Sequence, residues 1–175
     1  MADYLELNGP WEQLVNYENI RIRRIAPNAP VRLSNEIRVV PFLVPHRQEY
    51  SEVAGYRIEG PNRTMLFIPD IDSWEDWDLE GHRIEAVIQS VDIAFIDGSF
   101  FANGEIPGRD MSGFPHPFIS HTMERLRSLP DSQRAKVRFI HLNHTNAALD
   151  ITSEEARAVI DAGFGLARPM ERYGL

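Results

Sequence analysis

The chain has 175 residues, of which 43% are hydrophobic, and its formal net charge is -8. This composition predicts a soluble protein with a substantial core, and the acidic balance argues against a nucleic-acid partner, whose phosphates require clustered Lys and Arg. Because the chain has no cysteine, disulfides and thiolate metal sites are excluded, and a transition metal would need His, Asp or Glu ligands.

The first part of the chain is predicted to be a series of strands separated by turns. Isoleucine alternates with arginine at the first strand, and "APNAP" then forms a rigid turn. The turn "GPN" at 60–62 separates the last two strands and predicts a hairpin. The predicted strands are 19–25, 36–45, 54–59 and 64–69.

The second part alternates between strands and helices, which is typical of α/β proteins. A capping box, "TSEE" at 152–155, starts the last helix, and Gly163 ends it. The helices are predicted at 74–89, 117–129 and 152–162, and the strands at 91–96, 137–140 and 164–168. A loop rich in Gly and Pro covers 98–115. We therefore predict an α/β (α+β) fold in which helices pack on a sheet.

Four of the predicted strands end in a residue that can bind a metal ion: His46, Asp70, Asp97 and His141. A single Asp or His at a strand end is usually a turn or cap residue. Four such ends form a different pattern, because sites in layered α/β proteins collect at the carboxyl ends of strands. The pattern predicts a site for Zn, Mn or Fe, and the alternative is a set of polar turns without a metal.

The segments that carry these residues resemble the C-terminal half of the metallo-β-lactamase fold, over residues 36 to 170. "VPH", "YSEVAGYRIE", "LFIPDID", "DIAFIDGSFF", "PGRDM" and "FIHLNHTN" occur in the order expected of one branch of that fold. This branch includes coenzyme PQQ synthesis protein B and related phosphodiesterases. The resemblance implies an αββα sandwich, of which this chain holds the C-terminal half with part of the second sheet completed.

The resemblance also implies roles for individual residues. His46, Asp70 and His141 match metal ligands of the family, and Asp70 matches the aspartate that bridges two ions. His116, in "GFPHPF", matches a histidine that assists the leaving group in related phosphodiesterases. Residues implied to orient or support the ligands without binding the metal are Asn143, His144, Asn146 and Asp97.

The chemistry implied for the family is hydrolysis. Two ions lower the pKa of a bridging water, which attacks a carbonyl or phosphoryl centre while the metals stabilise the developing oxyanion. In the PQQ-type branch, oxidative chemistry with iron and oxygen is the alternative. We expect Zn as the metal, with Mn or Fe as alternatives, and a small-molecule substrate.

The chain departs from the family at the signature HxHxDH, which supplies the remaining ligands and the aspartate that handles the proton of the attacking water. No HxH occurs in the sequence, and "MADYLELNGPWEQLV" would fall after that motif in a complete member. The chain is therefore either a fragment or shortened reading frame, or a member that has lost the site. We expect a site that is half present.

Three functions stay open: a metal-dependent hydrolase, a non-catalytic binding or carrier protein of the PQQ pathway, and an inactive truncated product. The sequence predicts one incomplete domain over 1–175, with a lead-in at 1–35 and the metal-bearing half at 36–175. The start of the chain lacks the basic segment of a signal peptide, and no apolar run approaches membrane-spanning length. We therefore expect a cytoplasmic protein without a membrane partner, and a homodimer is left open.

Overall fold

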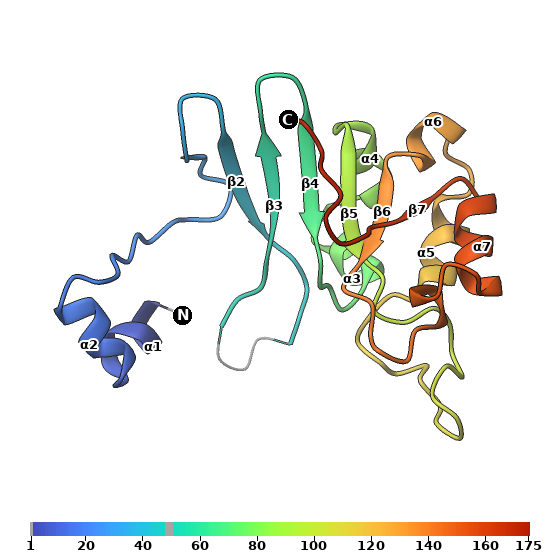
Figure 1. Cartoon of the computed structure of the whole chain (residues 1–175), viewed down its shortest axis with the longest axis horizontal. Helices are drawn as coiled ribbons and strands as arrows, with labels where there is room; N and C mark the ends of the chain where they lie inside the picture. The colour runs from blue at the N-terminus through green and yellow to red at the C-terminus, as the bar shows by residue number, and fades with distance from the viewer. Residues whose placement is uncertain (1, 48–50) are drawn as a thin grey trace.

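The computed structural model describes residues 2–47 and 51–175, so that Tyr50 of the "YSEVAGYRIE" segment lies outside the described residues. One seven-stranded sheet runs through the molecule, and helices α3, α4, α5 and α7 pack on one of its faces (Figure 1). The mixed α/β class predicted from the sequence is confirmed. Within the described part of the chain, no helix has the length and apolar character needed to cross a membrane.

The strands lie in the sheet in the order in which they occur in the chain. They are β1 (Val31–Arg32), β2 (Arg38–Leu43), β3 (Ala54–Glu59), β4 (Thr64–Ile68), β5 (Ile93–Asp97), β6 (Val137–Ile140) and β7 (Gly165–Leu166). Strands β1 to β4 pair antiparallel, which confirms the predicted hairpin, and β4 to β7 pair parallel. The carboxyl ends of β4, β5 and β6 therefore meet at one edge of the sheet.

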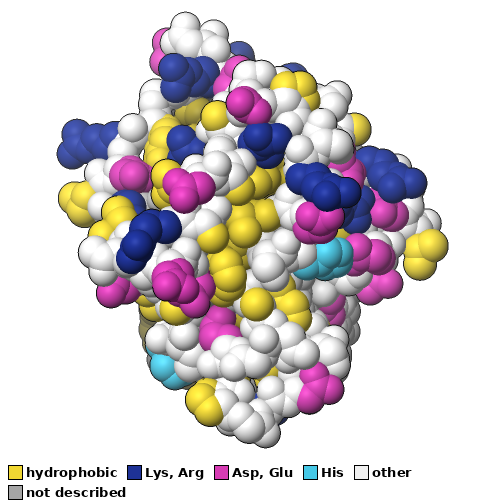
Figure 2. Space-filling model, turned by 90° about the vertical axis from the view of Figure 1, so that its right-hand side faces the viewer, with side chains coloured by type: hydrophobic (Ala, Val, Ile, Leu, Met, Phe, Trp, Pro, Cys, Tyr) yellow, Lys and Arg dark blue, Asp and Glu magenta, His cyan; other side chains and the backbone are white. Residues whose placement is uncertain are grey.

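The hydrophobic core lies between the sheet and its helices. The helices in this part are α3 (Trp74–Leu79), α4 (Ile84–Gln89), α5 (Ile119–Leu126), α6 (Asp131–Arg134), the 3₁₀-helix η1 (Ala147–Leu149) and α7 (Glu154–Asp161). Ile96 and Phe139 project from the sheet into this core, where Trp74, Ile84 and Ile119 meet them, all fully buried. On the side that carries α5 to α7, a strip of hydrophobic side chains runs between charged ones (Figure 2).

The start of the chain differs from the prediction. No strand forms at 19–25, and two short helices that the sequence analysis missed, α1 (Ala2–Leu7) and α2 (Trp11–Asn16), precede it. Arg24 lies 2.6 Å from Asp3 and 2.7 Å from Glu6, so this arginine contacts the first helix. The alternation of isoleucine and arginine therefore does not mark the two faces of a strand, and its last arginine instead pairs with acidic side chains of α1.

Two helix predictions need correction. The segment 74–89 is two helices, because Gly81 has a φ of 88° and Arg83 is extended. The last helix is capped by Ser153, whose side chain accepts a hydrogen bond from the Ala156 amide at 3.0 Å, and not by Thr152. Its predicted end is confirmed, since Gly163 has a φ of 84°.

The C-terminal segment, residues 167–175, crosses the face of the sheet that lies opposite the helices (Figure 1). Tyr173 packs edge-on against Phe95 of β5, with ring centroids 5.2 Å apart. The last residue, Leu175, reaches the β3–β4 turn, where a β-carbon at Gly60 would collide with it. A glycine at position 60 is therefore needed for this close approach.

Candidate metal centre

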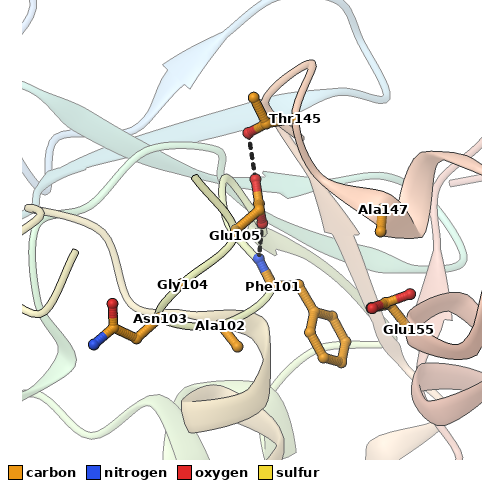
Figure 3. A pocket seen from close by; sticks show the side chains of 8 residues that line it. All are labelled: Phe101, Ala102, Asn103, Gly104, Glu105, Thr145, Ala147 and Glu155. Atoms are coloured by element: carbon orange, nitrogen blue, oxygen red, sulfur yellow. Dashed lines mark hydrogen bonds between the residues drawn. The ribbon is translucent and has the colours of Figure 1, made fainter. Parts of the chain in front are cut away.

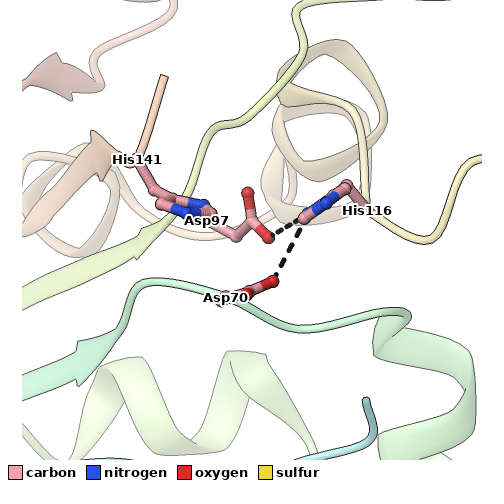
Figure 4. Close-up of side chains that lie close together, drawn as sticks. All are labelled: Asp70, Asp97, His116 and His141. Carbon is pink, nitrogen blue, oxygen red and sulfur yellow. Dashed lines mark hydrogen bonds and ion pairs between the residues drawn. The ribbon is translucent and has the colours of Figure 1, made fainter. Parts of the chain in front are cut away.

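Two aspartates and two histidines come together at the edge where β4, β5 and β6 end. Asp97 is the last residue of β5, and His141 directly follows β6. Asp70 follows β4, and His116 comes from the long loop between β5 and α5. Figure 4 shows the four side chains pointing toward one another. We call Asp70, Asp97, His116 and His141 the four-residue cluster; each offers one ligand atom, and these atoms all lie within 4.8 Å of one another.

Asp97 anchors the four-residue cluster. Its side chain is fully buried, its Oδ1 accepts a hydrogen bond from the Ser99 amide at 2.8 Å, and its Oδ2 accepts one from the Ile71 amide at 3.2 Å. The second bond ties the end of β5 to the residue after Asp70. The backbone therefore fixes both carboxylates relative to each other.

His116 contacts both aspartates. Its Nδ1 lies 2.9 Å from Asp97 Oδ2 and 3.5 Å from Asp70 Oδ1. Burial alone would lower the pKa of His116, but the hydrogen bond to Asp97 and the charges of Asp97, Asp70 and Asp72 raise it, and the net shift is upward. The site therefore favours a positive charge at this position.

His141 is held in an uncommon backbone conformation, with a φ of 62°. Its Nδ1 lies 2.9 Å from the Ser99 hydroxyl, which also reaches the His141 carbonyl at 3.4 Å. If the hydroxyl donates to the carbonyl, it accepts from Nδ1, and Nε2 is then free to bind a metal. Positive φ at a non-glycine residue is strained, and such strain is typical of functional sites.

His46 lies beside the four-residue cluster and outside it. Its Nε2 is 3.2 Å from Asp70 Oδ2 and 3.8 Å from Asp72 Oδ1, while its Nδ1 is 3.0 Å from the Arg47 carbonyl oxygen. Within the described part of the chain, Asp70 Oδ1 and Asp72 Oδ1 are buried and have no hydrogen-bond partner. Buried carboxylate oxygens without a hydrogen-bond partner are costly, so this part of the site favours a cation.

The remaining predicted residues lie around the site. Asn146 is buried, caps η1 by accepting from the Ala148 amide, and donates to the Gly98 carbonyl at 2.9 Å. Asn143 donates to the Thr145 hydroxyl at 2.7 Å. His144 is exposed and lines a hollow of ≈ 300 Å³ beside the cluster, together with Ser99, Phe100, His116, His141, Leu142 and Asn143.

The structure thus brings two of the three predicted metal ligands, Asp70 and His141, into one cluster with Asp97 and His116, which were assigned supporting and leaving-group roles. All of these roles stay predictions. Sequence reasoning missed Asp72 and Ser99. Asp72 could have been found as the second aspartate of "PDID", directly after a strand end. Ser99 could have been found from its place two residues after Asp97, in the turn that follows the strand.

Known proteins resemble this chain in sequence and in fold. Residues 1–142 match the family model described as beta-lactamase superfamily domain. Coenzyme PQQ synthesis protein B from Methylococcus capsulatus is 28% identical over 98 residues, which cover 51% of this chain and 31% of that protein. Zn²⁺-bound PqqB from Methylobacterium extorquens has a TM-score of 0.64 at 19% identity, covering 83% of this chain and 52% of that one.

The metallo-beta-lactamase fold protein YhfI from Bacillus subtilis has a TM-score of 0.49 at 11% identity, covering 82% of this chain and 54% of that one. The chain spans 31% of the curated relative and 52% of the PqqB structure that it matches. The predicted resemblance to the metallo-β-lactamase fold, and to its PQQ synthesis protein B branch, is confirmed by the family model and by the two matches to PQQ synthesis protein B.

Proposed function

This chain belongs to the beta-lactamase superfamily. We propose that it binds a divalent metal ion in the four-residue cluster and acts as a metal-dependent hydrolase. The observation that carries the proposal is the convergence of four ligand atoms within 4.8 Å of one another. A tetrahedral ion with bonds of about 2.1 Å needs ligand atoms about 3.4 Å apart, so small side-chain movements would suffice.

The donor set fits such an ion. Two imidazoles and two carboxylates suit Zn²⁺, and also Mn²⁺ or Fe²⁺. Asp72 adds a third carboxylate nearby, and buried oxygens of Asp70 and Asp72 are without partners in the described part of the chain. An oxygen too enclosed for a water molecule can still bind an ion, because metal–oxygen bonds are short, about 2.0–2.2 Å.

The protein's own groups have defined tasks in this proposal. A bound divalent ion would lower the pKa of a bound water and polarise a substrate oxygen. Ser99 orients the His141 ring and leaves its Nε2 free. His116 would bind the ion through Nδ1, which lies 2.9 Å from Asp97 Oδ2, and its ring also lines the hollow in which a small-molecule substrate would bind. Similarity to coenzyme PQQ synthesis protein B supports a substrate that takes part in the synthesis of that coenzyme.

Metal binding by the purified, metal-free chain tests the first half of the proposal. Titration with Zn²⁺, followed by calorimetry, should give about one ion per chain, and His116→Ala or Asp97→Asn should weaken binding at least tenfold. His121→Ala is the matched control, because His121 is exposed and pairs with Glu75, 3.3 Å away. If the unchanged chain has no affinity for Zn²⁺, Mn²⁺ or Fe²⁺, the proposal fails.

Hydrolysis is tested separately. The chain loaded with metal is given a chromogenic phosphodiester and a β-lactam, with His116→Ala as the inactive reference. Turnover that His116→Ala abolishes supports the hydrolase. Tight binding of a small anionic quinone by the metal-free chain, without turnover, would support the carrier function instead.

A further inference from the structure

Both histidines of the four-residue cluster are carried by loops. His116 belongs to the segment between β5 and α5, and His141 to the segment between β6 and η1. Neither ring is held by the hydrogen bonds of the sheet, and His141 also needs an unfavourable backbone conformation. Apart from the contact between His116 and Asp97 of β5, the positions of both ligands therefore depend on contacts between the two loops.

Two asparagines in the loop that carries His141 form hydrogen bonds to the first residues of the β5–α5 loop. The Asn143 amide donates to the Ser99 carbonyl at 2.9 Å, and Asn146 Nδ2 donates to the Gly98 carbonyl at the same distance. These bonds end at residues 98 and 99, directly after β5. They leave the rest of the β5–α5 loop without a connection to the loop that carries His141.

Glu105 supplies that connection (Figure 3). Its Oε2 accepts a hydrogen bond from the Phe101 amide at 2.7 Å, and its Oε1 contacts the Thr145 hydroxyl. The Thr145 hydroxyl in turn accepts from Asn143 Nδ2 at 2.7 Å. Because a hydroxyl has one proton and here accepts one bond, it must donate that proton to Glu105. The chain of bonds is thus ordered in one direction, from Asn143 through Thr145 to Glu105.

We propose that Glu105 is a positioning residue for the metal centre: through Thr145 and Asn143 it holds the loop that carries His141 in its ligand-binding conformation. This inference rests on the proposed metal-binding function. Glu105 touches neither the metal ligands nor the hollow beside them, so its effect must pass through the loop. Removal of a group bonded directly to a metal ligand typically changes metal affinity by about 10–100-fold, and an effect that passes through the loop should lie at the low end of that range.

Thr145 offers the sharpest test, because its hydroxyl can be removed by one substitution and kept by another. Thr145→Val keeps the shape and removes the hydroxyl, whereas Thr145→Ser keeps it. We expect Thr145→Val and Glu105→Gln each to weaken Zn²⁺ binding about tenfold, and Thr145→Ser to change it less than twofold. The double variant Glu105→Gln, Thr145→Val should lose no more than either single variant, because both remove the same contact.

Glu155→Gln is the matched control, since Glu155 lines the same pocket as Glu105 and Thr145, which is separate from the hollow beside the metal centre (Figure 3). It should leave Zn²⁺ affinity unchanged. If Thr145→Val lowers the unfolding midpoint but binds Zn²⁺ as well as Thr145→Ser, Glu105 serves stability alone and the inference is wrong.

A readout on the metal-free chain separates this inference from the proposed function. The three-bond coupling between the amide and α protons of His141 reports its φ. We expect the same coupling in the unchanged chain and in Thr145→Ser, and a different one in Thr145→Val and Glu105→Gln. If neither the unchanged chain nor any of these variants binds Zn²⁺, the proposed function is wrong. An unchanged His141 coupling in Thr145→Val would overturn the positioning role.

Discussion

His46 Nε2 lies 3.2 Å from Asp70 Oδ2, while Nδ1 of the same ring lies 3.0 Å from the Arg47 carbonyl oxygen. A carbonyl oxygen can only accept, so Nδ1 carries a proton, and in the neutral ring Nε2 presents a lone pair to the carboxylate. Two lone pairs at this distance repel each other. A metal ion between His46 and Asp70 would remove the repulsion, so this arrangement favours a metal ion at the rim of the cluster.

Substitution of His46 should therefore weaken metal binding, but less than substitution of a residue inside the four-residue cluster. We expect His46→Ala to lower Zn²⁺ affinity about tenfold and His116→Ala about a hundredfold. Calorimetric titration measures both. His82→Ala is the control, because His82 is exposed and stacks on Trp77 away from the site. Equal losses for His46→Ala and His82→Ala would contradict the prediction.

Metal removal should lower stability. An ion that binds only the folded chain adds about 2.7 kcal/mol to the free energy of unfolding when its free concentration is 100 times its Kd. Urea unfolding with Zn²⁺ and with a chelator measures this increment. In Asp97→Asn the increment should fall toward zero, whatever the stability of that variant without metal. An undiminished increment in Asp97→Asn would place the ion elsewhere.

Trp74 and Trp77 provide a matched pair for the value of one buried hydrogen bond. Trp74 Nε1 donates to the Thr122 hydroxyl at 2.9 Å, whereas the buried Trp77 Nε1 has no partner in the described part of the chain. Trp74→Phe and Trp77→Phe remove similar volumes from the core. We expect Trp74→Phe to cost about 1 kcal/mol more free energy of unfolding. Chemical denaturation measures the difference, and equal costs would show that the bond adds nothing.

Arg125 joins three helices through carboxylates. Its Nε lies 2.8 Å from Glu85 Oε1 and its Nη2 lies 2.8 Å from Asp78 Oδ1, with 11% of the side chain exposed. Arg125→Met would leave Glu85 partly buried without its arginine and Asp78 with only the longer contact to Arg83, 3.4 Å away, at a cost of about 3 kcal/mol in the free energy of unfolding. Arg127→Met should change it by less than about 0.5 kcal/mol, because the Arg127 side chain is 74% exposed.

The same network predicts acid sensitivity. Burial raises the pKa of Glu85, but hydrogen bonds and the charge of Arg125 lower it more, so the folded-state pKa lies below its usual value. A depressed carboxyl pKa contributes stability above the unfolded pKa of about 4.3, and this stability is lost as the pH falls through the folded value. In Glu85→Gln, the free energy of unfolding should therefore fall less steeply as the pH is lowered, which chemical denaturation at a series of pH values measures. Glu124→Gln, at an exposed position, is the control and should show the same fall as the unchanged chain.

Much of the site could be predicted from the chain because short apolar runs end at Asp97 and His141, and parallel strands bring such ends together. His116 could not be placed in this way, since its position depends on a loop without periodicity. The helices α1 and α2 were missed for a related reason. They are six residues long and bury no side chain, so they show no apolar stripe.

The C-terminal segment ends beside the β3–β4 turn, at the amino end of β4, whereas Asp70 follows the carboxyl end of that strand. One strand length, about 16 Å, therefore separates the two places. A fluorescent fusion or a tether to a sensor surface attached after Leu175 would leave the metal site unobstructed. Deletion of residues 170–175 would instead remove Tyr173 and expose the ring of Phe95 to water. Extension after Leu175 should therefore be tolerated better than truncation before it.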